Sequence, residues 1–424
     1  MLEPCLAPRA HHDASARLPM RAGHAKPGLL VLTSTYPRYA GDPQPAFVHG
    51  LTRRLADRFE IDVLAPHAPG LALEEALDGV RLHRFRYAPG RLEDLAYDGG
   101  MLNRLRARPL RWLLVPFYLA AMALAARRLI RRGGHSVVHA HWLVPQGLVA
   151  LVCRRVAGRR VPVLCTLHGG DLYGLNAGWA NRLRAAILKR LDAVTVVSEA
   201  MRARVAALGR TMPASAVIPM GTDLTGLFTP DPAVEREPFL LFVGRLVRKK
   251  GVDLLLDAFA SMAHDHPDLG VVIAGDGPER ATLESQAERL GIGARVRFVG
   301  SVPNDRLPGL YRRATAAVFP FRQEPSGDQE GFGLVVVEAM GCGCPVVVGD
   351  VAAVRQIVRH DATGLLVDPA NRQALADSLA SLIGNSSLRR RLGEHGRLAS
   401  LEKFDWGMSA ANYSTLIAAL SSAR

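Results

Sequence analysis

The sequence predicts an α/β protein with two doubly wound domains, each a parallel sheet covered by helices. Apolar strand-like runs alternate with helical stretches over residues 28–219, and the same rhythm starts again at residue 239. Between the two series, residues 228–238 read FTPDPAVEREP, and prolines and acids of this kind are typical of a domain linker. A chain of 424 residues is long enough to give both domains a core.

Charge and cysteine content narrow the class of protein. The net charge is +14, of which +13 falls in residues 1–235, so the first half is expected to face something anionic. No helix-turn-helix, zinc or aromatic stacking signature accompanies this charge, so a nucleic-acid partner is not expected. The five cysteines form no disulfide framework or metal-ligand pattern, which fits a metal-free protein of the reducing cytoplasm.

Two segments stand outside the strand–helix rhythm. Residues 1–26 lack an apolar signal-peptide core and are expected to form a disordered leader. Residues 112–126 form a 15-residue apolar run, shorter than the roughly 20 residues of a membrane-spanning helix. A buried crossover helix is the favoured interpretation of 117–126. The basic stretch before it is expected to face an anionic membrane on the cytosolic side through Arg104, Arg106, Arg108 and Arg111.

The first domain is expected to begin with a strand at 28–35 and a helix from about Pro45. No Gly-x-Gly-x-x-Gly motif follows that strand, which argues against a nicotinamide oxidoreductase. The further strands expected in this domain are 61–65, 80–87, 137–140, 163–167, 193–197 and 215–219.

Histidines close two of these strands, at the edge of the sheet where ligands bind in such folds. His139 and His141 are expected on alternate faces, so that at most one enters a cleft. His168 is better placed, because the two glycines after it let a ligand approach the backbone. Asp171 is expected to cap the next helix.

The second domain opens with a strand at 239–243 and a basic turn before a helix at 252–262. Gly244-Arg245 and Lys250 in this turn suit a pyrophosphate group, since arginine offers a fork and lysine a point charge. A solvated basic turn remains the alternative. Further strands are expected at 271–274 and 295–299, and a helix at 307–313.

Residues 316–350 form the most informative strand–helix–strand unit. The strand 316–321 is followed by a polar loop, by Glu330-Gly-Phe-Gly and by a helix that reaches Met340. The amides of residues 331–333 are expected to be unpaired first-turn donors for phosphate or sugar oxygens. Glu330 and Glu338 would lie roughly 12 Å apart along a helix, which suits the two ends of one elongated ligand. A dipole-stabilised Glu330 and a solvated Glu338 remain the alternative.

These motifs together resemble a retaining glycosyltransferase of family 4, over about residues 28–420. The motifs are Gly244-Arg245 with Lys250, Gly275-Asp-Gly-Pro278, Glu330-Gly-Phe-Gly with Glu338, and Gly341 to Val348. The resemblance implies the GT-B architecture, in which two Rossmann-like domains face one cleft. It also implies the division into an acceptor-binding domain at 27–235, a nucleotide-sugar-binding domain at 236–405 and a helix at 406–424 that returns to the first domain.

The resemblance also implies residue roles in transfer from a nucleotide-sugar co-substrate, with no metal or other cofactor. Arg245 and Lys250 would bind the diphosphate and stabilise the departing nucleotide. Glu330 would hold sugar hydroxyls, Glu338 the ribose, and His168 would contact the donor sugar. The other implied donor-binding residues are Gly41, Gly244, Val299, Gly300, Gly331, Phe332 and Gly333. Retention of configuration would need no carboxylate nucleophile.

The sequence departs from the family pattern in two loops. After the first strand only Gly41 stands where a Gly-Gly turn is usual, and 351–356 lacks the usual Gly-Gly and Pro-Glu. We expect the second departure to alter the shape of that loop without loss of catalysis. The resemblance as a whole implies a hexosyltransferase that acts on a saccharide or lipid-linked acceptor in cell-surface polysaccharide or glycolipid synthesis, and the arginines of 104–132 favour the lipid-linked acceptor. A catalytically silent sugar-nucleotide or polysaccharide binder is the alternative, and a sugar-nucleotide epimerase is a more distant one.

Overall fold

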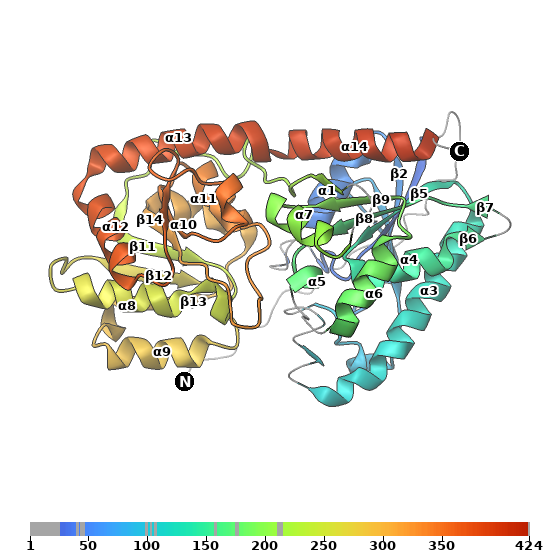
Figure 1. The fold of residues 1–424 in the computed structure, drawn as a ribbon, viewed down its shortest axis with the longest axis horizontal. Coiled ribbons are helices and arrows are strands. Elements are labelled where there is room, and N and C mark those ends of the chain that lie inside the picture. Colours follow the sequence, from blue (N-terminus) through green and yellow to red (C-terminus); the bar gives the residue numbers. More distant parts are fainter. Residues whose placement is uncertain are drawn as a thin grey trace, which may run out of the picture.

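The computed structural model describes residues 26–39, 42, 47–97, 101, 104–105, 108–156, 159–173, 178–209 and 215–422. Two α/β domains lie side by side, and the last two helices run along one side of both (Figure 1). Each domain contains a mainly parallel sheet, which confirms the predicted fold class. The expected leader at 1–26 lies almost entirely outside the described residues.

The N-terminal sheet has the strand order β10-β9-β8-β5-β1-β2-β4-β3. Every pair is parallel except β3 with β4, and the inner strands are buried on both faces because helices cover the sheet. Its strands are β1 Gly28–Leu32, β2 Glu60–Pro66, β3 Glu74–Leu77, β4 Val80–Phe85, β5 His135–His141, β8 Val163–Leu167, β9 Ala193–Val196 and β10 Ser215–Val217. Its helices are α1 Phe47–Leu55, α3 Val115–Arg132, α4 Leu148–Cys153, α5 Gly170–Tyr173, α6 Gly178–Leu188 and α7 Glu199–Ala206.

Three short strands in this domain were not predicted. The edge strand β3 has the sequence EEAL, which lacks the apolar run that marks a strand in the sequence. The other two, β6 Arg155–Val156 and β7 Arg159–Arg160, pair with each other in a separate two-stranded ribbon. Backbone pairing with a neighbour, rather than side-chain pattern, creates all three.

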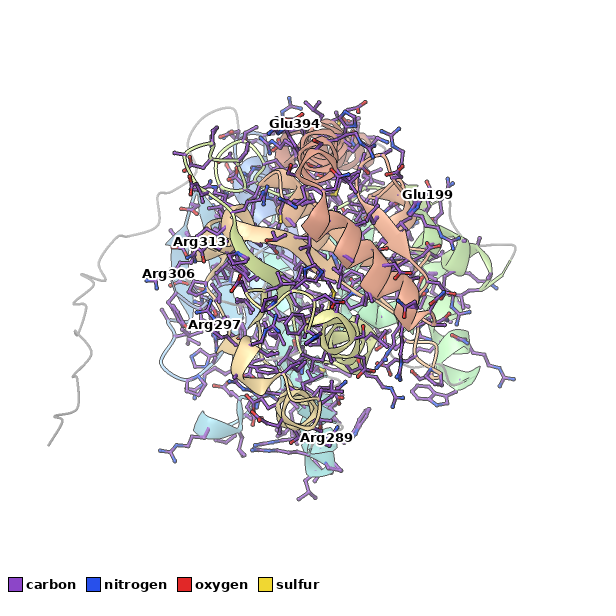
Figure 2. The ribbon with its side chains drawn as sticks, turned by 90° about the vertical axis from the view of Figure 1, so that its left-hand side faces the viewer. Glu199, Arg289, Arg297, Arg306, Arg313 and Glu394 are labelled. Carbon is purple, nitrogen blue, oxygen red and sulfur yellow. The ribbon has the colours of Figure 1, made fainter. Side chains whose placement is uncertain are left out.

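The C-terminal sheet is fully parallel, with the order β13-β12-β11-β14-β15-β16. Arg297 projects from the edge strand β13, and an exposed charge of this kind protects an open edge from pairing with another chain (Figure 2). Its strands are β11 Glu237–Val243, β12 Gly270–Ala274, β13 Val296–Gly300, β14 Ala314–Phe319, β15 Val346–Gly349 and β16 Leu365–Val367. The remaining helices are α8 Val252–Met262, α9 Arg280–Arg289, α10 Leu307–Arg313, α11 Leu334–Gly341, α12 Arg372–Gly384, α13 Ser386–Phe404 and α14 Trp406–Ser422.

The junction between α13 and α14 carries the chain back to the N-terminal domain. Trp406 is buried there, and a Cβ added at Gly50 or Gly221 would lie 2.5 or 2.6 Å from its ring. The guanidinium of Arg54 lies 5.1 Å from the centre of the same ring. Only glycine leaves room for the indole at these two positions, so the ring fixes α14 against α1.

The helix α3 is the crossover that the apolar run predicted. Tyr118, Met122 and Ala126 are fully buried on the side of the sheet, whereas Phe117 and Leu124 are exposed. With the preceding 3₁₀ turn it forms the one stretch in the described residues, Pro109–Arg132, that is long and apolar enough to cross a membrane. A core helix passes the same test, so length and composition alone do not make it a membrane span.

Candidate active site

The two domains meet where the loop after β8 approaches the loop before α11. A Cβ added at Gly331 would lie 3.1 Å from the carbonyl oxygen of His168 and 3.2 Å from the Cα of Gly169. Gly169 has φ +98°, a conformation that favours glycine, so the chain turns sharply here. Glycine on both sides thus lets the two backbones nearly touch, and His168 and the Glu330 loop come together as predicted.

Glu330 forms an ion pair with Lys250, and both residues belong to the C-terminal domain. Lys250 Nζ lies 2.5 Å from Glu330 Oε2, and both side chains are about 15% exposed. Burial acts to raise the pKa of this carboxyl, but the charges of Lys250 and Lys249 outweigh it and hold the pKa at about 2. Glu330 is therefore an anion at neutral pH, and the ion pair fixes the position of the Lys250 ammonium group.

The helix α11 begins later than the sequence suggested. It starts at Leu334, after Gly333 with φ +105°, so Glu330 lies in the loop rather than in a helical turn. The amides of Gly331 and Phe332 donate to Glu330 Oε1 at 3.1 and 3.3 Å. The expectation that these amides are unpaired is therefore wrong, because the neighbouring carboxylate accepts from both.

Glu338 lies inside α11 and contacts a buried tyrosine. The Tyr311 hydroxyl donates to Glu338 Oε2 at 3.2 Å. Burial raises the pKa of Glu338 to about 7, and this hydrogen bond and the charge of Lys250 only partly offset the effect. Glu330 and Glu338 thus have separate environments and opposite pKa shifts.

Arg245 lies in the turn after β11, next to Gly244 with φ +148°. The turn is supported from behind, because a Cβ at Gly275 would lie 1.8 Å from the Gly244 carbonyl oxygen. Burial and the nearby charge of Arg104 lower the pKa of Arg245. Arg104 belongs to the other domain, so arginines from both domains face the same space.

The contribution of Arg104 was missed at the sequence level, where it was assigned to a membrane-facing group. Asp94 Oδ2 lies within 3.9 Å of Arg104 and Arg108, and 2.7 Å from Arg111. Arg111 is only 17% exposed, so its charge is turned toward the protein. The structure gives no support for membrane contact through these arginines. Arg106, the fourth member, lies outside the described residues, as does the donor-binding candidate Gly41.

The histidine arrangement also differs from expectation. His139 and His141 share one face of β5, with ring centres 4.2 Å apart, because residues two apart in a strand point the same way. The assignment to alternate faces was wrong. His141 Nδ1 lies 2.9 Å from His168 Nε2, so the three imidazoles form one buried row. Burial lowers the pKa of His139 and of His168 to about 3, which leaves both neutral at pH 7.

Asp171 holds the His168 loop in place. Its Oδ1 accepts from the amides of His168 and Gly169 at 3.2 and 3.1 Å, and its Oδ2 accepts from the amide of Leu143 at 3.1 Å. The expected role as a helix cap is wrong, because Asp171 lies within α5 and its carboxylate instead joins two loops. These contacts fix the backbone carbonyl of His168 toward Gly331.

The remaining donor-binding candidates lie at the carboxyl end of β13. Val299 is 45% exposed, and the Gly300 carbonyl accepts from the Gly275 amide at 2.7 Å. This places them beside the Gly244 turn, at the same edge of the sheet. Within the described residues, no group of three or more His, Cys, Asp or Glu side chains is arranged to hold a metal ion.

This fold and site define a two-domain sugar-nucleotide enzyme of the GT-B type. The family model "Glycosyltransferase Family 4" matches residues 45–225, and "Glycosyl transferases group 1" matches residues 227–399. A GDP-mannose-dependent alpha-(1-6)-phosphatidylinositol monomannoside mannosyltransferase from Mycolicibacterium smegmatis is 30% identical over 70% of this chain and 81% of its own length. An N-acetyl-alpha-D-glucosaminyl L-malate synthase from Bacillus anthracis is 26% identical over 71% of this chain and 79% of its own.

A solved structure extends the similarity to almost the whole fold. Sucrose-phosphate synthase from Thermosynechococcus elongatus superposes with a TM-score of 0.76 and 25% identity, covering 94% of this chain and 100% of the other. The chain belongs to glycosyltransferase family 4, and it is a glycosyltransferase that takes its sugar from a nucleotide-sugar donor. The alternative of a catalytically silent binder is not favoured.

Proposed function

We propose that this protein is a retaining, metal-independent hexosyltransferase that acts on a lipid-linked acceptor in glycolipid or cell-surface polysaccharide synthesis. The observation that carries the proposal is the Lys250–Glu330 pair, 2.5 Å apart, placed directly behind the contact between Gly331 and His168. The donor sugar would lie at this contact, with its diphosphate toward Arg245 and Lys250. Glu330 would hold the sugar hydroxyls, and His168 would contact the donor sugar.

GDP-mannose is the donor that we propose first. The support is the relative from Mycolicibacterium smegmatis, whose name specifies GDP-mannose and which shares 30% identity over 81% of its length. Glu338, half-buried beside Tyr311, would bind the ribose hydroxyls. A ribose contact does not distinguish one nucleotide base from another. Selection of the base is therefore expected to depend on Val299 and Gly300 at the end of β13.

Retention is proposed because Glu330 is poorly suited to act as a nucleophile or base. Its Oε2 accepts from Lys250 and its Oε1 accepts from two amides, and its pKa is held near 2. A carboxylate engaged at both oxygens orients hydroxyl groups better than it attacks carbon. The departing diphosphate would be stabilised by Lys250 and Arg245 on the face where the acceptor attacks.

The same two cations are proposed to replace a divalent metal at the diphosphate. Arg245 is half-buried, and Arg104 adds a third positive charge from the other domain. Charges fixed in a partly desolvated site stabilise a growing negative charge more strongly than they would in water. Transfer in the presence of excess EDTA tests this part, and loss of activity that added magnesium restores would refute it.

The lipid-linked acceptor is proposed from an exposed apolar surface next to the cleft. Four side chains in eight residues, at the 3₁₀ turn Pro109–Leu114 and the start of α3, are between 50% and 82% exposed. We call them the apolar ridge: Leu110, Trp112, Leu113 and Phe117. Aromatic and aliphatic groups beside arginines suit the boundary of an anionic cytosolic membrane, so the ridge rather than the arginines would provide the main contact.

Sedimentation with phospholipid vesicles tests the membrane contact. Leu110→Ser with Leu113→Ser should reduce binding to anionic vesicles severalfold, while Leu398→Ser, an equally exposed leucine on α13, should not. Equal binding by all three proteins would remove the support for a membrane-bound acceptor. It would leave the transferase proposal intact.

The reaction itself is tested by the configuration of its product. Purified protein would be incubated with GDP-mannose and a mannosylated phosphoinositide, and the new linkage would be assigned by proton NMR. An α-linked product from the α-linked donor supports retention. A β-linked product would refute it.

A further inference from the structure

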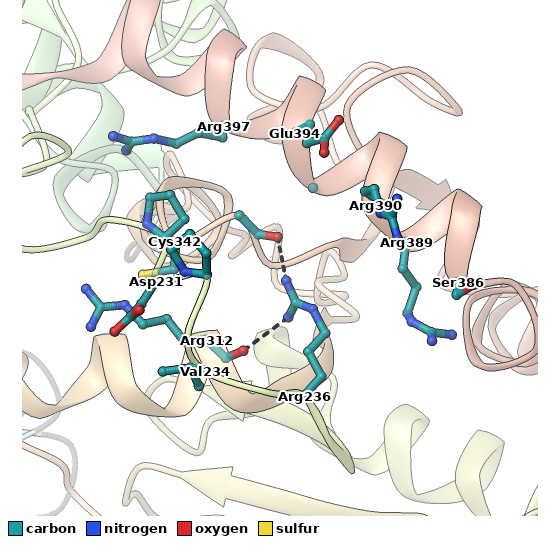
Figure 3. A pocket seen from close by; sticks show the side chains of 14 residues that line it. Asp231, Val234, Arg236, Arg312, Cys342, Ser386, Arg389, Arg390, Glu394 and Arg397 are labelled. Atoms are coloured by element: carbon teal, nitrogen blue, oxygen red, sulfur yellow. Dashed lines mark hydrogen bonds between the residues drawn. The ribbon is translucent and has the colours of Figure 1, made fainter.

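A second concave site lies in the C-terminal domain, at the end of α11 opposite to the Glu330 loop. This cavity of about 410 Å³ is bounded by the interdomain linker, by the end of α11 at Cys342 and Gly343, and by α13 between Ser386 and Arg397 (Figure 3). The eight-residue helix α11 separates the cavity from the Glu330 loop by about 12 Å along the helix, whereas Glu338 lies about one turn from Cys342. The transfer reaction gives this cavity no role.

Arginine dominates the lining of the cavity. Five arginines line it, one from the linker, one from α10 and three from α13, together with the two carboxylates Asp231 and Glu394. The arginines are Arg236, Arg312, Arg389, Arg390 and Arg397.

Main-chain carbonyl groups, and not carboxylates, hold four of these arginines in place. Arg236 donates to the carbonyls of Ala314 and Gly343 at 2.6 and 2.7 Å. Arg312 donates to the Thr229 carbonyl at 2.7 Å, and Arg397 donates to the Phe228 carbonyl at 3.1 Å.

Arg389 is fixed in the same way, since it donates to the Ile383 carbonyl at 2.8 Å. Across the described parts of the chain, none of the five arginines is ion-paired with a carboxylate. A carbonyl dipole fixes a guanidinium without neutralising it, so the lining keeps a net charge of about three positive units at neutral pH.

Fixed guanidinium groups around a hollow suit one class of ligand. The planar fork of arginine pairs with two oxygens of a phosphate group, and it loses little freedom on binding when its position is already set. A volume of this size is in the range that holds small-molecule ligands. We propose that this cavity binds a phosphorylated small molecule, separately from the donor in the cleft.

The position of the cavity gives such a ligand a route to the active site. The chain passes between the domains twice, through the linker before β11 and at the junction of α13 with α14. Arg312 and Arg397 already tie α10 and α13 to the linker at Thr229 and Phe228. A phosphate held by Arg397 and Arg236 would brace both passages, and so would favour one arrangement of the two domains.

Calorimetric titration with inorganic pyrophosphate tests the proposal in protein carrying Lys250→Ala, which weakens phosphate binding in the cleft. We expect residual binding that falls tenfold or more when Arg390→Glu is added. The Arg390 side chain is exposed and makes no hydrogen bond or ion pair within the described residues, so this change should leave the thermal midpoint unaltered.

Arg391→Glu is the matched control, because this neighbour is paired with Asp361 and does not line the cavity. It should leave pyrophosphate binding within twofold. Arg397→Gln provides a second test inside the cavity and should also weaken binding.

Absence of pyrophosphate binding in the Lys250→Ala protein would overturn the proposal, and so would equal losses from Arg390→Glu and Arg391→Glu. The arginines would then serve only to cap main-chain carbonyls. The titration measures no transfer, so its outcome is independent of the proposed donor and acceptor.

Discussion

Gly331 approaches His168 so closely that a single added methyl group would lie 3.1 Å from the His168 carbonyl oxygen. The two residues belong to different domains, and each lies in a loop that carries site residues. Their contact therefore sets how near the Glu330 loop lies to the row of His139, His141 and His168. The first prediction tests whether catalysis depends on this distance.

Gly331→Ala should lower kcat/KM about tenfold. The added Cβ requires the backbones to separate by a few tenths of an ångström, and a misplacement of 1 Å costs about 10²-fold in rate. The control is Gly309→Ala in α10, where an added Cβ meets no atom within 4 Å. Steady-state kinetics should show a loss in the first variant alone, with similar melting temperatures for both. Unchanged kinetics in Gly331→Ala would mean that the domains do not need to meet this closely.

Lys250→Ala should lower kcat by about 10²- to 10³-fold, as expected for the loss of one fixed charge at a leaving group. It also leaves the Glu330 carboxylate without its partner 2.5 Å away. Lys249→Ala removes the same charge one residue earlier, where the side chain pairs with Asp328 at 2.9 Å. We expect less than a tenfold loss there. Similar losses in both variants would show that the total positive charge of the turn, and not the position of Lys250, stabilises the leaving group.

The raised pKa of Glu338 predicts that the free energy of unfolding depends on pH. Its pKa is raised to about 7 from 4.5, so between these values the folded protein holds a proton that the unfolded chain has released. The free energy of unfolding should therefore fall as the pH rises from about 5 to 8, by up to about 3 kcal/mol from this group.

Glu338→Gln should remove that slope, and the variant should be more stable than the parent at pH 8 but not at pH 5. Urea unfolding at four pH values measures this, with Glu288→Gln on the exposed side of α9 as the control. Parallel pH profiles for the parent and Glu338→Gln would show that this carboxyl has an ordinary pKa.

Trp406→Ala should destabilise the docking of α14 on the N-terminal domain by about 3–5 kcal/mol, the usual cost of removing a large buried ring. The ring fills the space that Gly50 and Gly221 leave open. Met408→Ala, in the first turn of the same helix and 50% exposed, should cost far less. Circular dichroism during urea unfolding should show an early transition in Trp406→Ala only. A single unshifted transition would argue that α14 docks without this residue.

Local pattern predicted most elements of the fold. The expected helices at 252–262 and 307–313 match α8 and α10 residue for residue, because the apolar spacing is helical, Gly251 precedes α8 and Pro308 lies in the first turn of α10. The strand β3 was missed because its residues are polar. The start of α11 was placed too early, because Gly333 has a left-handed conformation that letters alone do not reveal.

Features that depend on how the two domains are arranged could not be predicted from the sequence. The sequence singled out His168, Lys250 and Glu330 as candidate site residues, and the structure brings them together, but their contact through Gly331 needs both loops in place. The same holds for Arg104, which the sequence places in a basic segment and the structure places near Arg245. The error over His139 and His141 was of another kind, since strand periodicity already requires them to share a face.

The central claim is that the contact between His168 and the Glu330 loop is a glycosyl-transfer site served by Lys250. The most direct measurement is nucleotide release from a panel of GDP-, UDP- and ADP-sugars by the parent, Lys250→Ala and Glu330→Ala proteins, with thermal shifts recorded in parallel. The account predicts stabilisation and slow release with one nucleotide class, GDP first, and loss of release in both variants. No shift and no release with any nucleotide sugar, or release that persists in both variants, would contradict it.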